Sequence, residues 1–338
     1  MDHILDIFNN DAFNVISMTG AINKVPNTFG LLNQLGIFKP APVDTTIVGI
    51  EISEGVINLV PSSERGAPGT PNKRGSRNMR YFKLPHFALE DNITADDVQN
   101  VRAFGGGGRL LAVAEKVLEV QMQMARKLYL TMEFMKNGAL NGQVLDSDGT
   151  VILDLWDLFG IEQKTVDFQL EVDGANLIEP CLDVKEHIEL HLKGESMTKI
   201  LALCSPGWWR KFITHPDVAE SYKYYAHSVN PLTSDVRSGF EHQDILWREY
   251  LGQATTHDGA TRYFIPTNGC LFLPLGTFDT FEENFGPADY LETANTLGLP
   301  LYSKLGKRDT YDKGQPVEAQ TNPLPIVKRP EVLVKGTF

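Results

Sequence analysis

A long amphipathic stretch from Arg109 to about Lys136 sets the strongest limit on the possible folds. Its apolar side chains recur at helical spacing: Leu110, Ala114, Val117, Met124, Leu128, Met132 and Met135. With a rise of about 1.5 Å per residue, one helix over this stretch is roughly 40 Å long. A helix of that length spans a whole domain, so the rest of the chain must pack along it.

Four consecutive glycines, Gly105, Gly106, Gly107 and Gly108, precede this helix. A glycine-rich turn before a helix can hold a phosphate, but a Walker loop ends in Gly-Lys-Ser/Thr, and here Arg109 and Leu110 follow. No acidic residue completes a dinucleotide-binding unit either. Because glycine tolerates the backbone angles of sharp bends, the run predicts a hinge.

Residues 45–60 and 79–90 are rich in β-branched and aromatic residues and predict two strands. Pro85 restricts the second strand to an edge or a bend. The segment between them, residues 61–77, is rich in Gly, Pro and Ser and has no large apolar side chain. The pattern predicts a long hairpin with an irregular tip. A lone hairpin is marginally stable in water, so we expect it to lie across another molecule.

The charge of this hairpin differs from that of the whole chain. Residues 61–80 carry a net charge of +4, with Glu64 as the single acid, on a chain of 338 residues whose net charge is −12. The five basic residues are Arg65, Lys73, Arg74, Arg77 and Arg80. A basic projection on an acidic body is complementary between neighbouring copies, and such charges direct encounter and register. The alternative is a solvated basic loop.

The flanking regions are less regular. Residues 1–44 predict a lead-in arm with one short helix, whose apolar side comprises Phe13, Ile16 and Ala21, followed by an extended run to Pro42. After the long helix, residues 141–159 predict a hairpin with its turn at Asp148-Gly149. We further expect helices over 187–202, 208–225 and 287–297, and strands over 200–204, 245–252 and 262–275. Residues 316–334 are β-like, and Pro323, Pro325 and Pro330 favour edge positions.

Side chains that suggest catalysis or metal binding form no complete motif. His187 and His191 share a helix face, but the Glu of the metalloprotease pattern is replaced by Ile188. Asp146 and Asp148 imitate the start of a calcium loop whose closing Glu is absent. Ser196 and Lys199 fit S-x-x-K without its companion motifs. The sequence therefore predicts no catalytic residue, no metal and no cofactor. A hydrolase acting through the histidines remains an alternative.

The remaining composition narrows the class of protein. Cys181, Cys204 and Cys270 are far apart and predict small buried residues in a reducing compartment. The aromatic cluster around Trp208, Trp209 and Phe212 could stack bases, but helical spacing favours core or an interface. An acidic balance disfavours a surface that grips nucleic acid. No signal peptide or membrane span is evident, so a cytoplasmic site of synthesis is expected.

Several short strings, taken in order, resemble the phage major capsid protein E family, the lambda-like shell proteins. Val48-Gly49-Ile50-Glu51 enters the hairpin and Pro85-His86-Phe87 leaves it. The others are Ile93-Thr94-Ala95-Asp96-Asp97-Val98-Gln99, Gly286-Pro287-Ala288-Asp289 with Glu292-Thr293, and Asn322-Pro323-Leu324-Pro325 with Arg329-Pro330. Each string is short, so the specificity of the resemblance comes from their number and order over nearly the whole chain.

This resemblance implies an α+β fold of the Hong Kong 97 type. The implied parts are an N-terminal arm (1–44), an extended loop and connector (45–104), a peripheral domain (105–184) with its spine helix at 109–136, an axial domain (185–300) and returning C-terminal strands (301–338). It also implies pentamers and hexamers in an icosahedral shell around DNA, hence a place in the virion. A scaffold, maturation protease, decoration protein or portal would be further partners. A nucleic-acid-binding or packaging protein that uses residues 61–80 is the alternative.

Overall fold

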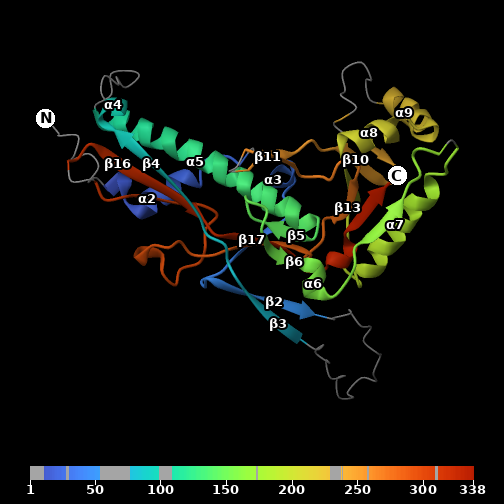
Figure 1. Ribbon diagram of the computed structural model, residues 1–338, viewed down its shortest axis with the longest axis horizontal. Coiled ribbons are helices and arrows are strands. Elements are labelled where there is room, and N and C mark those ends of the chain that lie inside the picture. The colour runs from blue at the N-terminus through green and yellow to red at the C-terminus, as the bar shows by residue number, and fades with distance from the viewer. Residues whose placement is uncertain are drawn as a thin grey trace, which may run out of the picture. The chain divides into compact units, whose positions relative to one another are not determined.

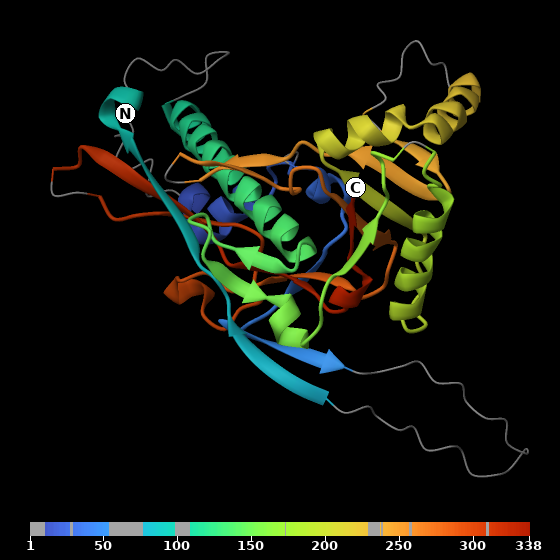
Figure 2. The ribbon, with the colours of Figure 1, turned by 45° about the vertical axis from the view of Figure 1, so that its right-hand side comes forward.

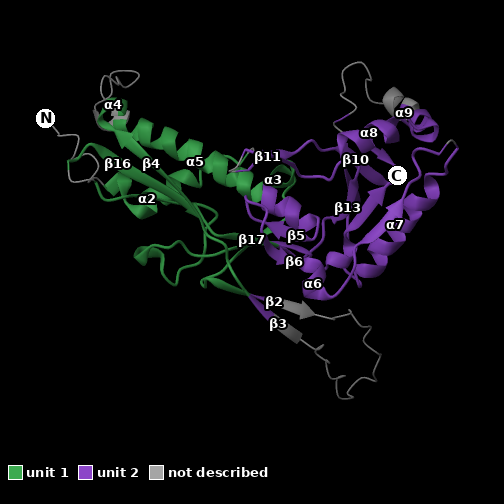
Figure 3. Cartoon of the chain, viewed as in Figure 1, with its two compact units in different colours: residues 1–48, 82–133, 283–325 green, residues 49–81, 134–282, 326–338 purple. Residues whose placement is uncertain are grey.

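The computed structural model describes residues 11–27, 30–53, 77–98, 109–172, 174–228, 237, 239–256, 259–308 and 311–338. The chain divides into two compact units (Figure 3). Unit 1 comprises residues 1–48, 82–133 and 283–325, and unit 2 comprises residues 49–81, 134–282 and 326–338. Each unit is therefore assembled from three separate stretches of the chain, so residues far apart in sequence share one core.

The described helices and strands are shown in Figure 1. The helices are η1 (Asp11–Phe13), α2 (Val15–Ile22), α3 (Leu31–Leu35), α4 (Ala95–Val98), α5 (Arg109–Leu140), α6 (Leu155–Phe159), α7 (Ile178–His191), α8 (Pro206–Thr214), α9 (Pro216–Ser228), η3 (Leu291–Thr293) and η4 (Pro330–Val332). The strands of the first half are β1 (Lys39–Pro42), β2 (Ile47–Ser53), β3 (Arg77–Lys83), β4 (Phe87–Thr94), β5 (Gln143–Leu145), β6 (Val151–Asp154) and β7 (Lys164–Asp167). The later strands are β8 (Lys199–Cys204), β9 (Phe240–His242), β10 (Ile245–Glu249), β11 (Gln253–Thr255), β12 (Thr261–Tyr263), β13 (Cys270–Leu275), β14 (Phe281–Phe285), β15 (Tyr302–Leu305), β16 (Gly314–Thr321), β17 (Pro323–Val327) and β18 (Val334–Thr337).

The predicted long helix is confirmed as α5, which continues to Leu140, four residues beyond the expected end. In unit 1 its apolar face packs with α2 and the three-stranded sheet β15-β16-β4. The buried cluster includes Met18 and Ile22 of α2, Val117 and Met124 of α5, and Val317 of β16. Burial of this amphipathic face stabilises the helix, because isolated helical propensity is weak beside tertiary contacts.

Unit 2 is built on a six-stranded mixed sheet in the order β7-β18-β13-β8-β10-β9. β8 pairs with β10 in parallel and with β13 in antiparallel register, and its residues from Ile200 to Cys204 are buried. The predicted aromatic core is confirmed for the buried rings of Trp208, Trp209 and Phe212. Trp208 stacks on Trp247 with ring centroids 5.4 Å apart. Each such ring buries a large apolar area, so this cluster dominates the core of unit 2.

Several turn predictions are confirmed. β5 and β6 form an antiparallel pair, and Asp148 accepts hydrogen bonds from Thr150 in the connecting turn. Pro85 lies in the break between β3 and β4. Pro323 and Pro325 lie in β17, an edge strand of the sheet β1-β14-β17, where missing N–H donors are tolerated.

Other predictions of local structure are wrong. In the arm, Ile16 is 84% exposed while Met18 and Ile22 are buried, and the run expected to be extended contains α3. The predicted hairpin over 141–159 ends at Asp154, whose side chain caps the short helix α6. That N-cap bond competes with continuation of the strand.

The later helix predictions also need correction. Helix α7 begins at Ile178 and ends at His191, ahead of the expected end at residue 202. The helix expected over 208–225 is two helices, α8 and α9, because Pro216 cannot continue the first one. Only the short turn η3 forms in 287–297, where Gly and Pro flank too few residues for a stable helix.

Candidate assembly surfaces

The predicted extended hairpin corresponds to β2 and β3, which pair as a two-stranded sheet (Figure 1). Its tip, residues 54–76, lies outside the described residues. Its base is fastened within unit 1, where the Leu84 backbone N–H donates to Thr46 O over 2.9 Å. His86 Nδ1 and Asn322 Oδ1, 2.8 Å apart, add a second connection. The hairpin thus leaves a fixed base, as a projecting interaction element requires.

Two of the five basic residues that are predicted to contact a neighbouring copy lie within the described part of the chain. Arg77 and Arg80 lie in β3, and Arg80 is exposed. Arg65, Lys73 and Arg74 lie outside the described residues, as do the hinge glycines Gly105 to Gly108, which directly precede α5. Contacts to a neighbouring copy for the five basic residues and bending at the glycines therefore stay predictions.

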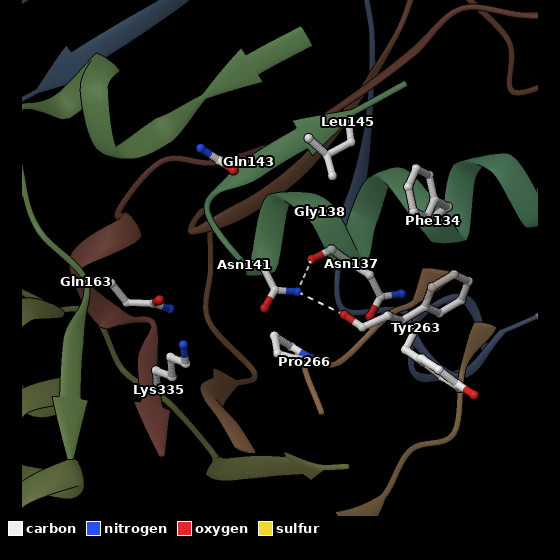
Figure 4. Close-up of a pocket in the computed structure, with 11 residues that line it drawn as sticks. Phe134, Asn137, Gly138, Asn141, Gln143, Leu145, Gln163, Tyr263, Pro266 and Lys335 are labelled. Carbon is white, nitrogen blue, oxygen red and sulfur yellow. Dashed lines mark hydrogen bonds between the residues drawn. The ribbon is translucent and has the colours of Figure 1, made fainter. Parts of the chain in front are cut away.

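A cavity of about 270 Å³ lies in unit 2 beside the C-terminal end of α5 (Figure 4). At this cavity, Asn141 Nδ2 donates hydrogen bonds to the carbonyl oxygens of Asn137 (2.8 Å) and Phe264 (3.1 Å). Gln163 and Lys335 approach from the side opposite Phe134 in the figure. Amide, aromatic and aliphatic groups line the cavity together with one ammonium, and no carboxylate, thiol or imidazole is among the described lining residues. The lining can donate and accept hydrogen bonds but offers no paired general acid and base.

The histidine pair of α7 is held by backbone groups. The rings of His187 and His191 lie with centroids 4.0 Å apart, and His187 Nε2 contacts Glu331 O over 3.0 Å. His191 Nδ1 contacts the carbonyl oxygen of His187 over 2.7 Å. Burial and the nearby His191 lower the pKa of His187. Within the described part of the chain, no group of three potential ligands is placed to hold a metal ion.

The lysine of the S-x-x-K match and the three cysteines show no catalytic arrangement. Lys199 of β8 forms an ion pair with Glu241 of β9 in the sheet of unit 2. All three cysteines are buried, as expected, and the Sγ atoms of Cys204 and Cys270 lie 3.3 Å apart across β8 and β13. Burial raises the pKa of the Cys181 thiol to about 12. A buried protonated thiol is a poor nucleophile, so these cysteines pack as small apolar residues.

Sequence reasoning missed two surfaces of unit 1. The first is the leucine loop, residues 286–299 between β14 and β15, whose Leu291 is 96% exposed. The second is the α2–α5 groove, a cavity of about 610 Å³ lined by residues of both helices and of the turn that follows α2. Leucines 291, 297 and 299 are visible in the sequence, but we expected residues 287–297 to form a helix. Their exposure depends on tertiary context that periodicity does not report.

The fold is that of the Hong Kong 97-type capsid proteins. A crystal structure assigned to a prophage capsid protein of Escherichia coli CFT073 superposes with a TM-score of 0.61 over 96% of this chain and 99% of that chain, at 13% sequence identity. The family model of the phage major capsid protein E matches residues 14–338. This chain belongs to that family, and a shell-forming role follows.

Curated relatives agree with the family. The major capsid protein of Pseudomonas phage KPP10 is 30% identical over 345 residues, covering 96% of each chain. The major capsid protein of Salmonella phage Felix O1 is 25% identical over 351 residues, covering 95% of each chain. Consistent with this, the described helices include none that is long and apolar enough to cross a membrane.

Proposed function

We propose that copies of this chain assemble into pentamers and hexamers of an icosahedral phage head, with each basic hairpin lying against an acidic surface of a neighbouring copy. The observation that carries the proposal is the exposed Arg80 on β3 at the foot of a segment of charge +4, in a chain whose other residues total −16. The chain performs no catalytic step in this role. Its surface charge sets register, while many modest contacts together hold the shell.

The proposed parts follow the family arrangement. Residues 1–44 form the arm, 45–104 the extended loop, 105–184 the peripheral domain, 185–300 the axial domain and 301–338 the returning strands. The proposed boundary at residue 184 falls within α7. Bending at Gly105 to Gly108 lets the loop and α5 change their angle as the shell expands.

The proposed partners and location follow from the same role. Assembly takes place in the host cytoplasm and the product is the virion. A scaffold or maturation protease, a portal and a decoration protein act on the proposed shell. The genome is enclosed without sequence-specific binding, which fits a net charge of −12 because an acidic wall does not adhere to phosphates.

Electron microscopy of the purified full chain, with light scattering, tests the proposal. We expect closed shells, tubes, or rings of five and six copies. Arg77→Glu with Arg80→Glu should abolish or misdirect assembly while circular dichroism shows a folded chain. Lys164→Glu with Lys185→Glu changes the net charge by the same amount on unit 2 and serves as the control.

Normal shells from the hairpin double variant would refute the hairpin contact. A chain that stays monomeric, with and without a co-expressed scaffold, would refute self-assembly. Strong, salt-sensitive DNA binding by that monomer would favour a packaging protein, because each phosphate contact releases counterions.

A further inference from the structure

The leucine loop displays apolar side chains on a fixed backbone. Leu291 is 96% exposed, Leu297 63% and Leu299 43%. Single exposed leucines are common on protein surfaces. Three exposed leucines on one loop of fourteen residues make this loop a candidate interaction site.

Hydrogen bonds within unit 1 hold this loop in shape. Tyr302 Oη accepts from the Leu299 N–H over 2.9 Å and lies 3.4 Å from the Leu297 carbonyl oxygen, to which it donates. Thr293 Oγ1 donates to Ala288 O over 3.0 Å. At the tip, Lys304 Nζ lies 2.7 Å and 2.8 Å from the two carboxylate oxygens of Glu292. A surface ordered before binding loses little further entropy when it docks.

The α2–α5 groove is an open, mainly apolar cavity that could receive exposed leucines. Its walls are mainly apolar, including Leu118, which is 42% exposed, and Met122. A Cβ built on Gly20 meets nothing within 4 Å, so the wall at α2 is open. The volume of about 610 Å³ lies in the range of clefts that bind ligands. No residue of the leucine loop is among the described residues that line the groove.

The two surfaces also carry opposite charges. Lys24 lines the groove and is exposed, and its ammonium has no ion pair with any described residue. Asp289 lies two residues before Leu291, is exposed, and its carboxylate likewise has no bond to a described residue. A rim pair of this kind fixes orientation more than affinity.

We propose that the leucine loop of one copy of this chain docks into the α2–α5 groove of a second copy, with Leu291 among the apolar groups and Asp289 beside Lys24. The inference deepens the proposed self-assembly and rests on it. Loop and groove are different surfaces of one unit, so the contact is head-to-tail. Contacts of that type close into rings when the rotation allows, as pentamers and hexamers require.

Cysteine cross-linking tests the contact in assembled particles of the full chain. The three native cysteines are buried, so Gly20→Cys and Leu291→Cys introduce the only thiols within the described residues that a short bismaleimide reaches readily. The double variant should give a ladder of covalent multimers on a denaturing gel. Each single variant should remain monomeric on the same gel.

A charge exchange provides a test without cysteines. Lys24→Glu and Asp289→Lys should each raise the subunit concentration needed for assembly about tenfold, and the double variant should restore it. Leu291→Glu should raise it further, whereas Leu190→Glu, at a leucine 71% exposed on α7 of unit 2, should leave it unchanged.

Three outcomes overturn the inference while leaving the proposed function intact. Shells that form without cross-links from the double cysteine variant show that loop and groove do not meet. A cross-linked dimer from Leu291→Cys alone shows that two leucine loops meet each other. Cross-linking of Gly20→Cys to Phe8→Cys within one chain shows that the chain's own N-terminal residues fill the groove. If the wild-type chain assembles under no condition, the proposed function fails together with the inference.

Discussion

Glu133 fastens the N-terminal arm to α5, and replacing it measures how firmly the arm is held. The side chain is fully buried, with 0% exposure, and its two carboxylate oxygens accept the backbone N–H groups of Leu32 (2.8 Å) and Asn33 (3.0 Å). Both donors belong to the first turn of α3, which has no side-chain cap of its own. Glu133 thus supplies the missing cap from a distant helix.

The variant Glu133→Gln keeps the shape of the side chain but turns one acceptor into a donor facing an N–H group. Hydrogen bonds to a charged acceptor contribute about 1.5–3 kcal/mol each, so we expect α3 to open about 2–3 kcal/mol more easily. That corresponds to a roughly 30- to 150-fold larger open population. Lys24 precedes α3 and is followed by Val25, whereas Lys39 is followed by Pro40 and is not a trypsin site. The rate of tryptic cleavage after Lys24 therefore reports the opening.

A matched control is Glu119→Gln on the same helix. Glu119 is 56% exposed, and among the described residues it pairs with Lys116 one turn away, so its loss should change cleavage less than twofold. Gly30→Ala should reproduce the effect of Glu133→Gln, because an added Cβ would collide with the Glu133 side chain. Equal cleavage rates for Glu133→Gln and Glu119→Gln would refute the reasoning.

Three further predictions concern unit 2, which contains all four tryptophans and is therefore followed by their fluorescence. Burial lowers the pKa of His187 from its ordinary 6.5, so folding favours the neutral ring. The thermal midpoint should therefore stay constant above about pH 6.5 and fall as the pH drops through the lowered pKa. The fall should be smaller in His187→Gln. Trp247→Ala removes a fully buried ring and should lower the free energy of unfolding by about 3–5 kcal/mol in urea titrations, and a change under 1 kcal/mol would contradict the core assignment. Gly142→Ala forces a Cβ into Trp156 at a φ of 86°, whereas Gly160→Ala at 65° meets nothing within 4 Å, so the first variant should lose more thermal stability than the second.

The sequence predicted the elements whose signal is local and strong. The period of Val117, Met124 and Leu128 identified α5, and Asp148-Gly149 identified a turn, because each pattern has one low-energy backbone solution. The end of α5 was placed too early, since Ala139 and Leu140 are buried by contacts that lie outside the helix. The fold itself was predicted by resemblance to a family rather than by these patterns.

The candidate surfaces were predicted less completely. Charge along residues 61–80 is visible in the sequence, but the acidic partner surface belongs to another copy. The leucine loop falls in residues 287–297, for which we expected a helix, whereas only the turn η3 forms. Whether a leucine faces core or solvent depends on segments hundreds of residues away, such as the pairing of Thr19 with Ser303, which spacing cannot reveal.

The position of β18 in the sheet determines when unit 2 can finish folding during synthesis. Val334–Thr337 lies between β7 and β13, pairing with the first in parallel and with the second in antiparallel register. Of the six strands, β18 is the last to leave the ribosome, yet it joins one side of the sheet to the other. A nascent chain can therefore carry its arm and hairpin into solution long before unit 2 can close. Until Val334–Thr337 is synthesised, β7 has no partner in this sheet, so unit 2 is completed only with the last residues of this chain.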